Sequence, residues 1–445
     1  MTRSNHSQTP GKAIVSRIVR REQQPRSFRR ATLLGAMVAA TALILTACVG
    51  QGSTAKTTVR SNDELPAKDV TTTLKLWNYA ADPIPHWWPD SIAEFNKDYP
   101  NVKVETSQIV YAQMTAKLLG SGISKSIPDG VLYNPADSAK LFSAGIIQDM
   151  TSEWNSFPDR ADFPQSVVLK SGSKVISVQG YLNTTAIWYN KTILDKVGIA
   201  APPTTLEQFD QALSAVHSAG YGGFLLSAQP NGSGEFDFLP WLYAYGQNYG
   251  HWDRTKVQAV FDMFGKWIAA GYIPKDVTNN SEGDNGNVFA NGNYAFAQNG
   301  NWNLMTARAA HYKFDWGVSD FPAGPAGAHG IGGGEGFSIG AGTKYPALVF
   351  KLFQTMLLTK DAQIAILKET GSLPVRADAA KDPAISSNPD LATYAKVVQE
   401  LGARPNTPKI SDYLNAMGKI WNSFVGGSTD SSEATDAIIK QLSTL

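Results

Sequence analysis

The sequence predicts an α/β fold built on a parallel sheet. Residues 72–77 alternate polar and apolar side chains as a strand does, and two further strand patterns follow at 102–105 and 130–133. Helical patterns fill the two intervals between these strands, over 91–99 and 111–120. Strands that alternate with helices are typical of a parallel sheet with helices on its faces. A body of about 375 residues is long enough for two domains or more.

The remainder of the chain continues this alternation. Thr204 or Thr205 is suited to cap the helix that begins at Leu206. Gly271 is suited to end the helix predicted over 257–270. We expect strands at 187–189 and 293–297, and helices at 206–218, 257–270, 347–358, 361–369, 413–424 and 434–442. No internal sequence repeat interrupts the series.

Cys48 is the only cysteine, and it follows a secretory signal pattern. Basic residues over 17–30 precede a short apolar run over 33–44, and Leu45-Thr46-Ala47 comes directly before the cysteine. This box resembles a bacterial lipoprotein signal, in which the thiol of the cysteine receives a lipid. A cysteine in a transmembrane helix is the alternative, but a spanning helix needs about 20 apolar residues. The pair Arg29-Arg30 leaves twin-arginine export open beside the general route.

We therefore expect three functions along the first part of the chain. Residues 1–47 are the predicted signal peptide, Cys48 is the predicted lipidation site, and 48–71 form a flexible tether rich in Gly, Ser, Thr, Lys and Asp. The expected location is the outer face of a bacterial cytoplasmic membrane, in a cell with one membrane or two.

Removal of the signal peptide changes the charge of the protein. Residues 1–47 carry eight Lys or Arg and one Glu, so the formal charge of +1 on the whole chain becomes −6. An acidic body argues against nucleic-acid binding, which needs a basic surface. Charged residues make up 17% of the chain, which contains eleven Trp, whereas about 25% charged residues is usual. This composition favours a neutral polar ligand.

Several kinds of chemistry have no motif in the sequence. The six His are scattered without metal-ligand spacing, and we predict no metal site and no cofactor. The glycine-rich segment 330–336 lacks the Lys and Ser/Thr of a phosphate loop, and no Gly-x-Ser-x-Gly is present.

Four segments with distinctive motifs follow one another along the chain. The first is Ile-Pro-Asp-Gly at 127–130, ahead of a buried strand pattern, and the second is Ile-Trp-Tyr-Asn-Lys at 187–191, followed by Pro-Pro-Thr at 202–204. The others are 289–302, which ends in Gly-Asn-Trp, and 332–339 together with Gly-Ser-Leu-Pro-Val-Arg at 371–376. In this order the segments resemble the extracellular solute-binding proteins of carbohydrate ABC importers, of the maltose-binding type, with Leu206 where the family usually has Trp.

The resemblance implies a two-lobed, type II periplasmic-binding-protein-like fold with the ligand in a cleft between the lobes. It places the chain crossings near 181–185, 312–316 and 358–361. Lobe 1 would then comprise 72–182 and 315–359, and lobe 2 would comprise 183–314 and 360–445. The implied protein is a monomer that is not an enzyme, binds a mono- or oligosaccharide and delivers it to ABC permease subunits in the membrane.

Sugar recognition needs flat aromatic rings for the C–H faces and polar side chains for the hydroxyls, because an unpaired buried polar group costs about 1–3 kcal/mol. Trp302 and Asn301 lie in a loop after a strand, where a ring could stack and an amide could bond hydroxyls. A packing role for Trp302 and a turn role for Asn301 are the alternatives. Strand ends supply four further candidates, which are Asn78, Tyr79, Asn134 and Asp137. Asp137 could instead cap a following helix.

Four candidates come from the second half of the chain. Glu235 lies in a Gly-rich segment, and Trp241 follows it with a spacing that would also suit a helix core. Glu335 stands among glycines, where a backbone can approach a ligand closely, although a solvated turn is the alternative. Arg376 could donate several hydrogen bonds to a sugar or could pair with an acid across the lobes. Arg404 is a weaker candidate of the same kind.

Two rival functions remain open at this level. A secreted carbohydrate-active enzyme would need two carboxylates about 5–5.5 Å apart for a retaining mechanism, and Glu235 with Glu335 or Asp237 is the conceivable pair. The same binding fold could instead hold a polyamine, a phosphate ester or a peptide.

Overall fold

The computed structural model describes residues 64–79, 84–402, 404–405 and 407–442, which all belong to one compact unit. The predicted signal peptide, the lipidation site Cys48 and most of the predicted tether lie outside these residues. No helix in the described part of the chain combines the length and the apolar character needed to cross a bilayer.

The first sheet, with the helices on its faces, is called the first lobe below. Its six strands run in the order β2-β1-β3-β12-β5-β4. The strands β1, β2 and β3 are parallel as predicted, whereas β12 lies antiparallel between β3 and β5. The sheet is therefore mixed, because a strand from far along the chain enters it in the reverse direction. The bounds are β1 (Thr72–Asn78), β2 (Val102–Gln108), β3 (Gly130–Tyr133), β4 (Val168–Ser171), β5 (Lys174–Gln179) and β12 (Gly336–Ile339).

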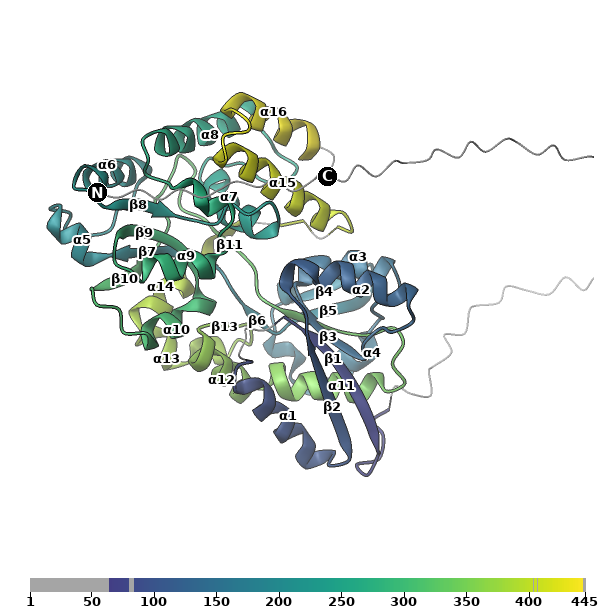
Figure 1. The fold of residues 1–445 in the computed structure, drawn as a ribbon. Coiled ribbons are helices and arrows are strands. Elements are labelled where there is room, and N and C mark those ends of the chain that lie inside the picture. The colour runs from purple at the N-terminus through teal and green to yellow at the C-terminus, as the bar shows by residue number, and fades with distance from the viewer. Residues whose placement is uncertain (1–63, 80–83, 403, 406, 443–445) are drawn as a thin grey trace, which may run out of the picture. The chain divides into compact units, whose positions relative to one another are not determined.

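Two apolar clusters cover the two faces of this sheet. One contains residues of α1 (Trp87–Asp98) and α11 (Pro346–Phe353), with Trp88 and Phe353 fully buried. The other contains residues of α2 (Met114–Ile123) and α3 (Ser138–Ser143). Figure 1 shows α11 lying across the strands on one side and α2 and α3 on the other.

The second sheet, with its helices, is called the second lobe. Its strands run β10-β7-β9-β8, with β7 antiparallel to both β9 and β10. A continuous aromatic core fills this lobe, in which the buried rings of Trp241, Trp267 and Trp421 pack among phenylalanines. The strand bounds are β7 (Thr185–Asn190), β8 (Gly222–Leu225), β9 (Tyr294–Gly300) and β10 (Trp316–Ser319).

The helices of the second lobe are α5 (Lys191–Lys196), α6 (Leu206–Ser218), α7 (Gly232–Tyr243), α8 (Arg254–Ala269), α9 (Glu282–Phe289), α10 (Leu304–Ala309), α14 (Pro389–Val397), α15 (Ile410–Val425) and α16 (Ser431–Leu442). The remaining elements are α12 (Lys360–Thr370) and the short α4 (Thr151–Ser156), α13 (Pro383–Ser386), β6 (Tyr181–Leu182), β11 (Gly330–Ile331), β13 (Leu373–Pro374) and β14 (Leu401–Gly402). The side chain of Thr205, and not that of Thr204, caps α6 by accepting from the Gln208 N–H.

The chain crosses between the sheets in three places. The first crossing lies between β5 and β7 and includes β6, which pairs with β13. The second crossing was expected at 312–316, and that expectation is wrong. Residues 316–319 form β10, which pairs with β7 at the edge of the second sheet, so residues 315–319 do not belong to the first lobe. The chain returns later, through the glycine-rich segment that leads into β12, and Gly333 and Asn183 exchange two backbone hydrogen bonds there.

The third crossing runs from α11 into α12. Ile366 of α12 packs in the core of the first lobe, and its neighbour Leu367 packs in the core of the second. Helix α12 therefore bridges the two cores.

Two fully buried amides join the first crossing to the third crossing and to the segments that follow α12. The Gln363 Nε2 donates to the carbonyl oxygens of Gly180 and Leu357, at 2.9 Å each. Its Oε1 accepts from the N–H groups of Val375 and Arg376, at 3.0 and 2.9 Å. The Asn301 Oδ1 accepts from the Thr184 N–H at 2.9 Å. The Asn301 Nδ2 donates to the oxygens of Leu182 and Gly371.

Replacing Gln363 with Leu should lower the free energy of unfolding by about 3 kcal/mol or more, because four buried backbone groups lose their partner. Urea unfolding measures this change. Gln211→Leu on the exposed face of α6 is the matched control and should stay within about 0.5 kcal/mol of the unsubstituted protein. Equal, small effects of both substitutions would contradict a stabilising role for Gln363.

Candidate functional site

The carboxyl ends of β1, β2 and β3 bring two tyrosines and an amide together on the first lobe. The rings of Tyr79 and Tyr111 meet edge to face, with their centroids 5.1 Å apart. The Asn134 Nδ2 donates to the Tyr111 hydroxyl at 3.1 Å, and its Oδ1 accepts from the Ala136 N–H. Parallel strands end at one edge of a sheet, which is why residues 79 and 134 lie close together.

Glu335 joins this group from the second crossing. The hydroxyls of Tyr181 and Tyr79 donate to its carboxylate, and the Asn183 Nδ2 lies 3.2 Å from its Oε2. Part of the side chain is still exposed, yet protein surrounds the carboxylate. Burial raises the pKa of Glu335 from 4.5 to about 7, against the lowering effect of the two tyrosine hydroxyls. Glu335 can therefore donate or accept a hydrogen bond near neutral pH.

The second lobe contributes an ion pair and two aromatic rings. The carboxylate of Glu235 is fully buried. It accepts a hydrogen bond from the Arg404 guanidinium and another, at 3.1 Å, from the Tyr249 hydroxyl. Burial raises the pKa of Glu235, and the Arg404 charge opposes that shift. The Arg404 guanidinium lies 5.0 Å from the Phe236 ring, and Trp302 meets that ring edge-on at 6.0 Å.

The tyrosines around Glu335 and the Glu235–Arg404 pair with its neighbouring rings face each other at the second crossing. A methyl group added at Gly333 would come within 2.8 Å of the Phe236 ring, and Glu335 is two residues further along. A methyl group at Gly232, at the start of α7, would lie 3.5 Å from the Tyr111 hydroxyl. We call the set formed by Tyr79, Tyr111, Glu235, Phe236, Trp302, Glu335 and Arg404 the interlobe site.

Hydrogen bonds beside this site connect the lobes directly. Asp137 accepts from the hydroxyls of Thr115 in the first lobe and Ser411 in the second, and Lys140 pairs with Asp412 at 2.7 Å. The Asp137 side chain does not cap α3, so the alternative role considered for it is not observed. Burial raises the pKa of Asp137, and both hydroxyls lower it.

Three predicted site residues have other roles in the structure. Trp241 is 1% exposed and packs against several core rings, including Phe209 and Phe264, so its helical spacing indicated a core position. Asn301 is fully buried, and the backbone of the crossings uses its amide. Arg376 forms ion pairs with Asp159, Asp162 and Asp378 at 2.7–2.8 Å, which was the alternative considered for it. Asn78 is fully buried beside Tyr79 at the end of β1.

Four contributors were absent from the predicted set. Tyr111 follows β2, so the strand-end rule that selected Tyr79 would also have selected it. Tyr181 and Asn183 lie in the first crossing, and Phe236 is adjacent to Glu235, but no local signal distinguished these three residues. Within the described residues, His, Cys, Asp and Glu side chains form no group of three suited to a metal ion.

Comparison with known proteins identifies the family. Residues 90–393 match the family of bacterial extracellular solute-binding proteins. The chain belongs to that family. This solute-binding protein is also 25% identical over 252 residues to Brucella abortus (strain 2308) and Brucella suis biovar 1 proteins that are named provisionally as binding proteins. The match covers 53% of this chain and only 60% of the length of those relatives.

Solved structures confirm the predicted two-lobed α/β fold of this solute-binding protein. MalE3 of T. maritima superposes with a TM-score of 0.76 at 18% identity, over 84% of this chain and 99% of that one. The GacH receptor of Streptomyces glaucescens gives a TM-score of 0.73 at 20% identity, over 84% and 100% of the two chains. A solute-binding protein of Thermotoga lettingae gives 0.76 at 16% identity, over 84% and 99%. At these identities the likeness concerns the fold.

Glu335→Gln should remove one source of pH dependence from stability. The pKa of Glu335 is about 7 in the folded protein and ordinarily 4.5. Between these two pH values the folded protein therefore holds a proton on Glu335 that the unfolded chain releases. The stabilisation is complete below the ordinary pKa and is lost as the pH rises through the folded pKa.

The free energy of unfolding of the unsubstituted protein, minus that of the variant, should thus fall by about 2–3 kcal/mol between pH 4.5 and pH 8. Urea unfolding at several pH values measures this difference. Glu207→Gln on the exposed face of α6 should keep the original slope. A pH-independent difference for Glu335→Gln would refute the raised pKa.

Proposed function

We propose that this protein captures a mono- or oligosaccharide between its two lobes and delivers it to a carbohydrate ABC permease. The observation that carries the proposal is the pairing of aromatic rings with polar groups on both sides of the second crossing. Tyr79 and Tyr111 lie on one side, and Phe236 and Trp302 lie on the other. Glu335 between them can bond a hydroxyl group as donor or acceptor.

The charge of the interlobe site supports a neutral ligand. Arg404 neutralises Glu235, and at neutral pH Glu335 is only partly ionised because its pKa is about 7. A polyamine needs a more acidic site, and a phosphate ester needs an unpaired cation. The bound sugars named for the structural relatives also support the proposal: MalE3 was solved with maltose, GacH with acarbose, and the Thermotoga lettingae protein with α-D-tagatose.

Binding without catalysis agrees with the positions of the carboxylates. Glu235 is engaged by Arg404 and Tyr249. Asp237 is fully buried and accepts from the Ser227 N–H and the Gln298 amide. Neither can supply the second free carboxylate that a glycosidase with Glu335 would need.

The proposed cellular arrangement follows from the first 71 residues. A lipid on Cys48 would hold the monomer on the outer face of the cytoplasmic membrane, and residues 48–71 would connect it to the folded body. Ligand binding would favour the form in which the lobes are joined by Ser411–Asp137 and Lys140–Asp412, and the permease would recognise that form.

A sugar should raise the unfolding temperature of the Cys48→Ser protein by a few degrees, since a ligand at about 100 times its Kd adds about 2.7 kcal/mol of stability. Thermal unfolding with maltose, maltotriose, acarbose and tagatose measures the shift. Putrescine and glycerol phosphate test the other solute classes. The carbohydrate assignment would be rejected if no sugar gave a shift while putrescine did, or while glycerol phosphate gave a shift that Trp302→Ala removes and Lys196→Gln leaves unchanged.

Trp302→Ala should raise the Kd for the bound sugar about tenfold or more, because the ring supplies apolar contact area to the sugar face. Isothermal titration calorimetry measures the change. Trp316→Ala is the matched control, because this half-buried Trp lies at the amino end of β10, at the far end of the sheet from Trp302. It should leave the Kd unchanged, whereas equal effects of both substitutions would place the sugar elsewhere.

A further inference from the structure

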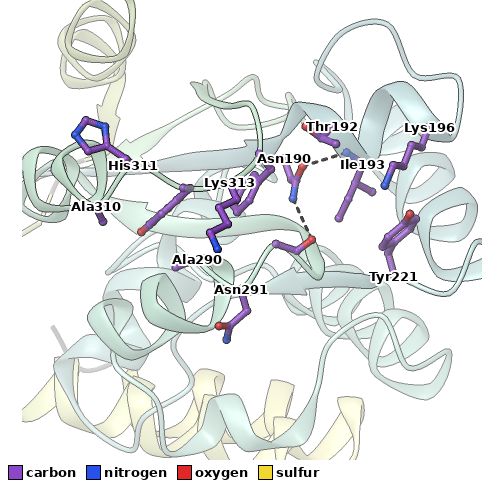
Figure 2. Close-up of a pocket in the computed structure, with 13 residues that line it drawn as sticks. Asn190, Thr192, Ile193, Lys196, Tyr221, Ala290, Asn291, Ala310, His311 and Lys313 are labelled. Carbon is purple, nitrogen blue, oxygen red and sulfur yellow. Dashed lines mark hydrogen bonds between the residues drawn. The ribbon is translucent and has the colours of Figure 1, made fainter.

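A pocket of about 590 Å³ lies at the end of the second sheet opposite to the interlobe site. Its lining includes Asn190 at the end of β7, Tyr221 just before β8, and the turn Ala290–Gly292 that leads into β9. The interlobe end of the same sheet lies where Thr185 pairs with Gly300. We call this cavity the back pocket (Figure 2).

The wall of the back pocket is fixed by hydrogen bonds. The Asn190 Oδ1 accepts from the Ile193 N–H at 3.0 Å, and its Nδ2 donates to the Gly292 oxygen at 3.4 Å. Gly292 has a φ of +75° and approaches the Phe314 ring so closely that an added methyl group would lie 3.0 Å from it. A preformed cavity of this size falls within the usual range of about 300–1,000 Å³ for small-molecule sites.

The charge of the lining is of one sign. The lining includes Lys196 and Lys313 and no Asp or Glu. Lys196 lies 5.6 Å from the centre of the Tyr221 ring, and among the described residues neither lysine has a carboxylate within ion-pair distance. In Figure 2 the two lysine side chains flank the Asn190–Gly292 hydrogen bond from opposite sides. The back pocket therefore differs in chemistry from the interlobe site, which contains Glu335 and a neutralised ion pair.

We propose that the back pocket binds a phosphate group carried on a small apolar or aromatic body. The ammonium groups of Lys196 and Lys313 are point-charge donors suited to phosphate oxygens, and the exposed Asn291 amide adds a neutral donor. The rings of Tyr221 and Phe314 offer an apolar surface for the remainder of the ligand. A free phosphate monoester and a phospholipid headgroup share this chemistry. The proposal does not depend on which solute occupies the interlobe site.

Calorimetric titration of the purified full chain tests the proposal. The probes are phenyl phosphate, inorganic phosphate and dihexanoyl phosphatidic acid below its micelle concentration, each raised to about 5 mM, above a millimolar Kd. Lys196→Gln and Lys313→Gln should each raise the Kd about tenfold, since each removes a charge-assisted hydrogen bond. Lys419→Gln, at an exposed position of α15, should leave the Kd unchanged.

The probes also separate the two sources. Saturable binding of phenyl phosphate that both pocket substitutions weaken supports a free monoester, and binding of the phosphatidic acid alone supports a headgroup. Absence of saturable binding by all three probes overturns the proposal. It is equally overturned if Lys419→Gln weakens binding as much as the pocket substitutions do, because the effect would then come from net charge. Circular dichroism of each variant verifies that it is folded.

Discussion

The arrangement of this protein depends on the hydrogen bonds that join its three chain crossings. Gln363 bonds backbone groups of the first crossing, of the helix end before α12, and of the segment after β13. Asn301 bonds the first crossing to Gly371. Both amides are fully buried. A buried amide that lost these partners would be costly, so the first and third crossings are held in one mutual arrangement. The two backbone hydrogen bonds between Asn183 and Gly333 add the second crossing.

The interlobe site is a consequence of that arrangement. Glu335 lies in the second crossing, and the backbone of its neighbour Gly333 pairs with Asn183 of the first crossing. The tyrosines that bond Glu335 come from the end of β1 and from the first crossing. Any movement of one lobe about these segments must change the surroundings of Glu335.

The two ends of the second sheet are chemically different. The end that carries Gly300 and Trp302 faces the first lobe, where aromatic rings and weakly charged groups gather. The end that carries Asn190 is bordered by Lys196 and Lys313 and contains no carboxylate among its lining residues. The antiparallel pairing of β7 with β9 and β10 separates these regions by the length of the strands.

The sequence alone determined the α/β class, the positions of most strands and helices and the family, because local periodicity and family stretches lie within short windows. It also selected Tyr79 and Glu335, since strand ends and glycine-rich turns are recognisable locally. The tertiary structure decided which side chains gather at the interlobe site and which serve the core. Arg376 meets Asp159 across 217 residues of chain, and β10 joins the second sheet by pairing with β7. Burial depends on partners that are distant in sequence, and for this reason the roles of Trp241, Asn301 and Arg376 could not be read from local patterns.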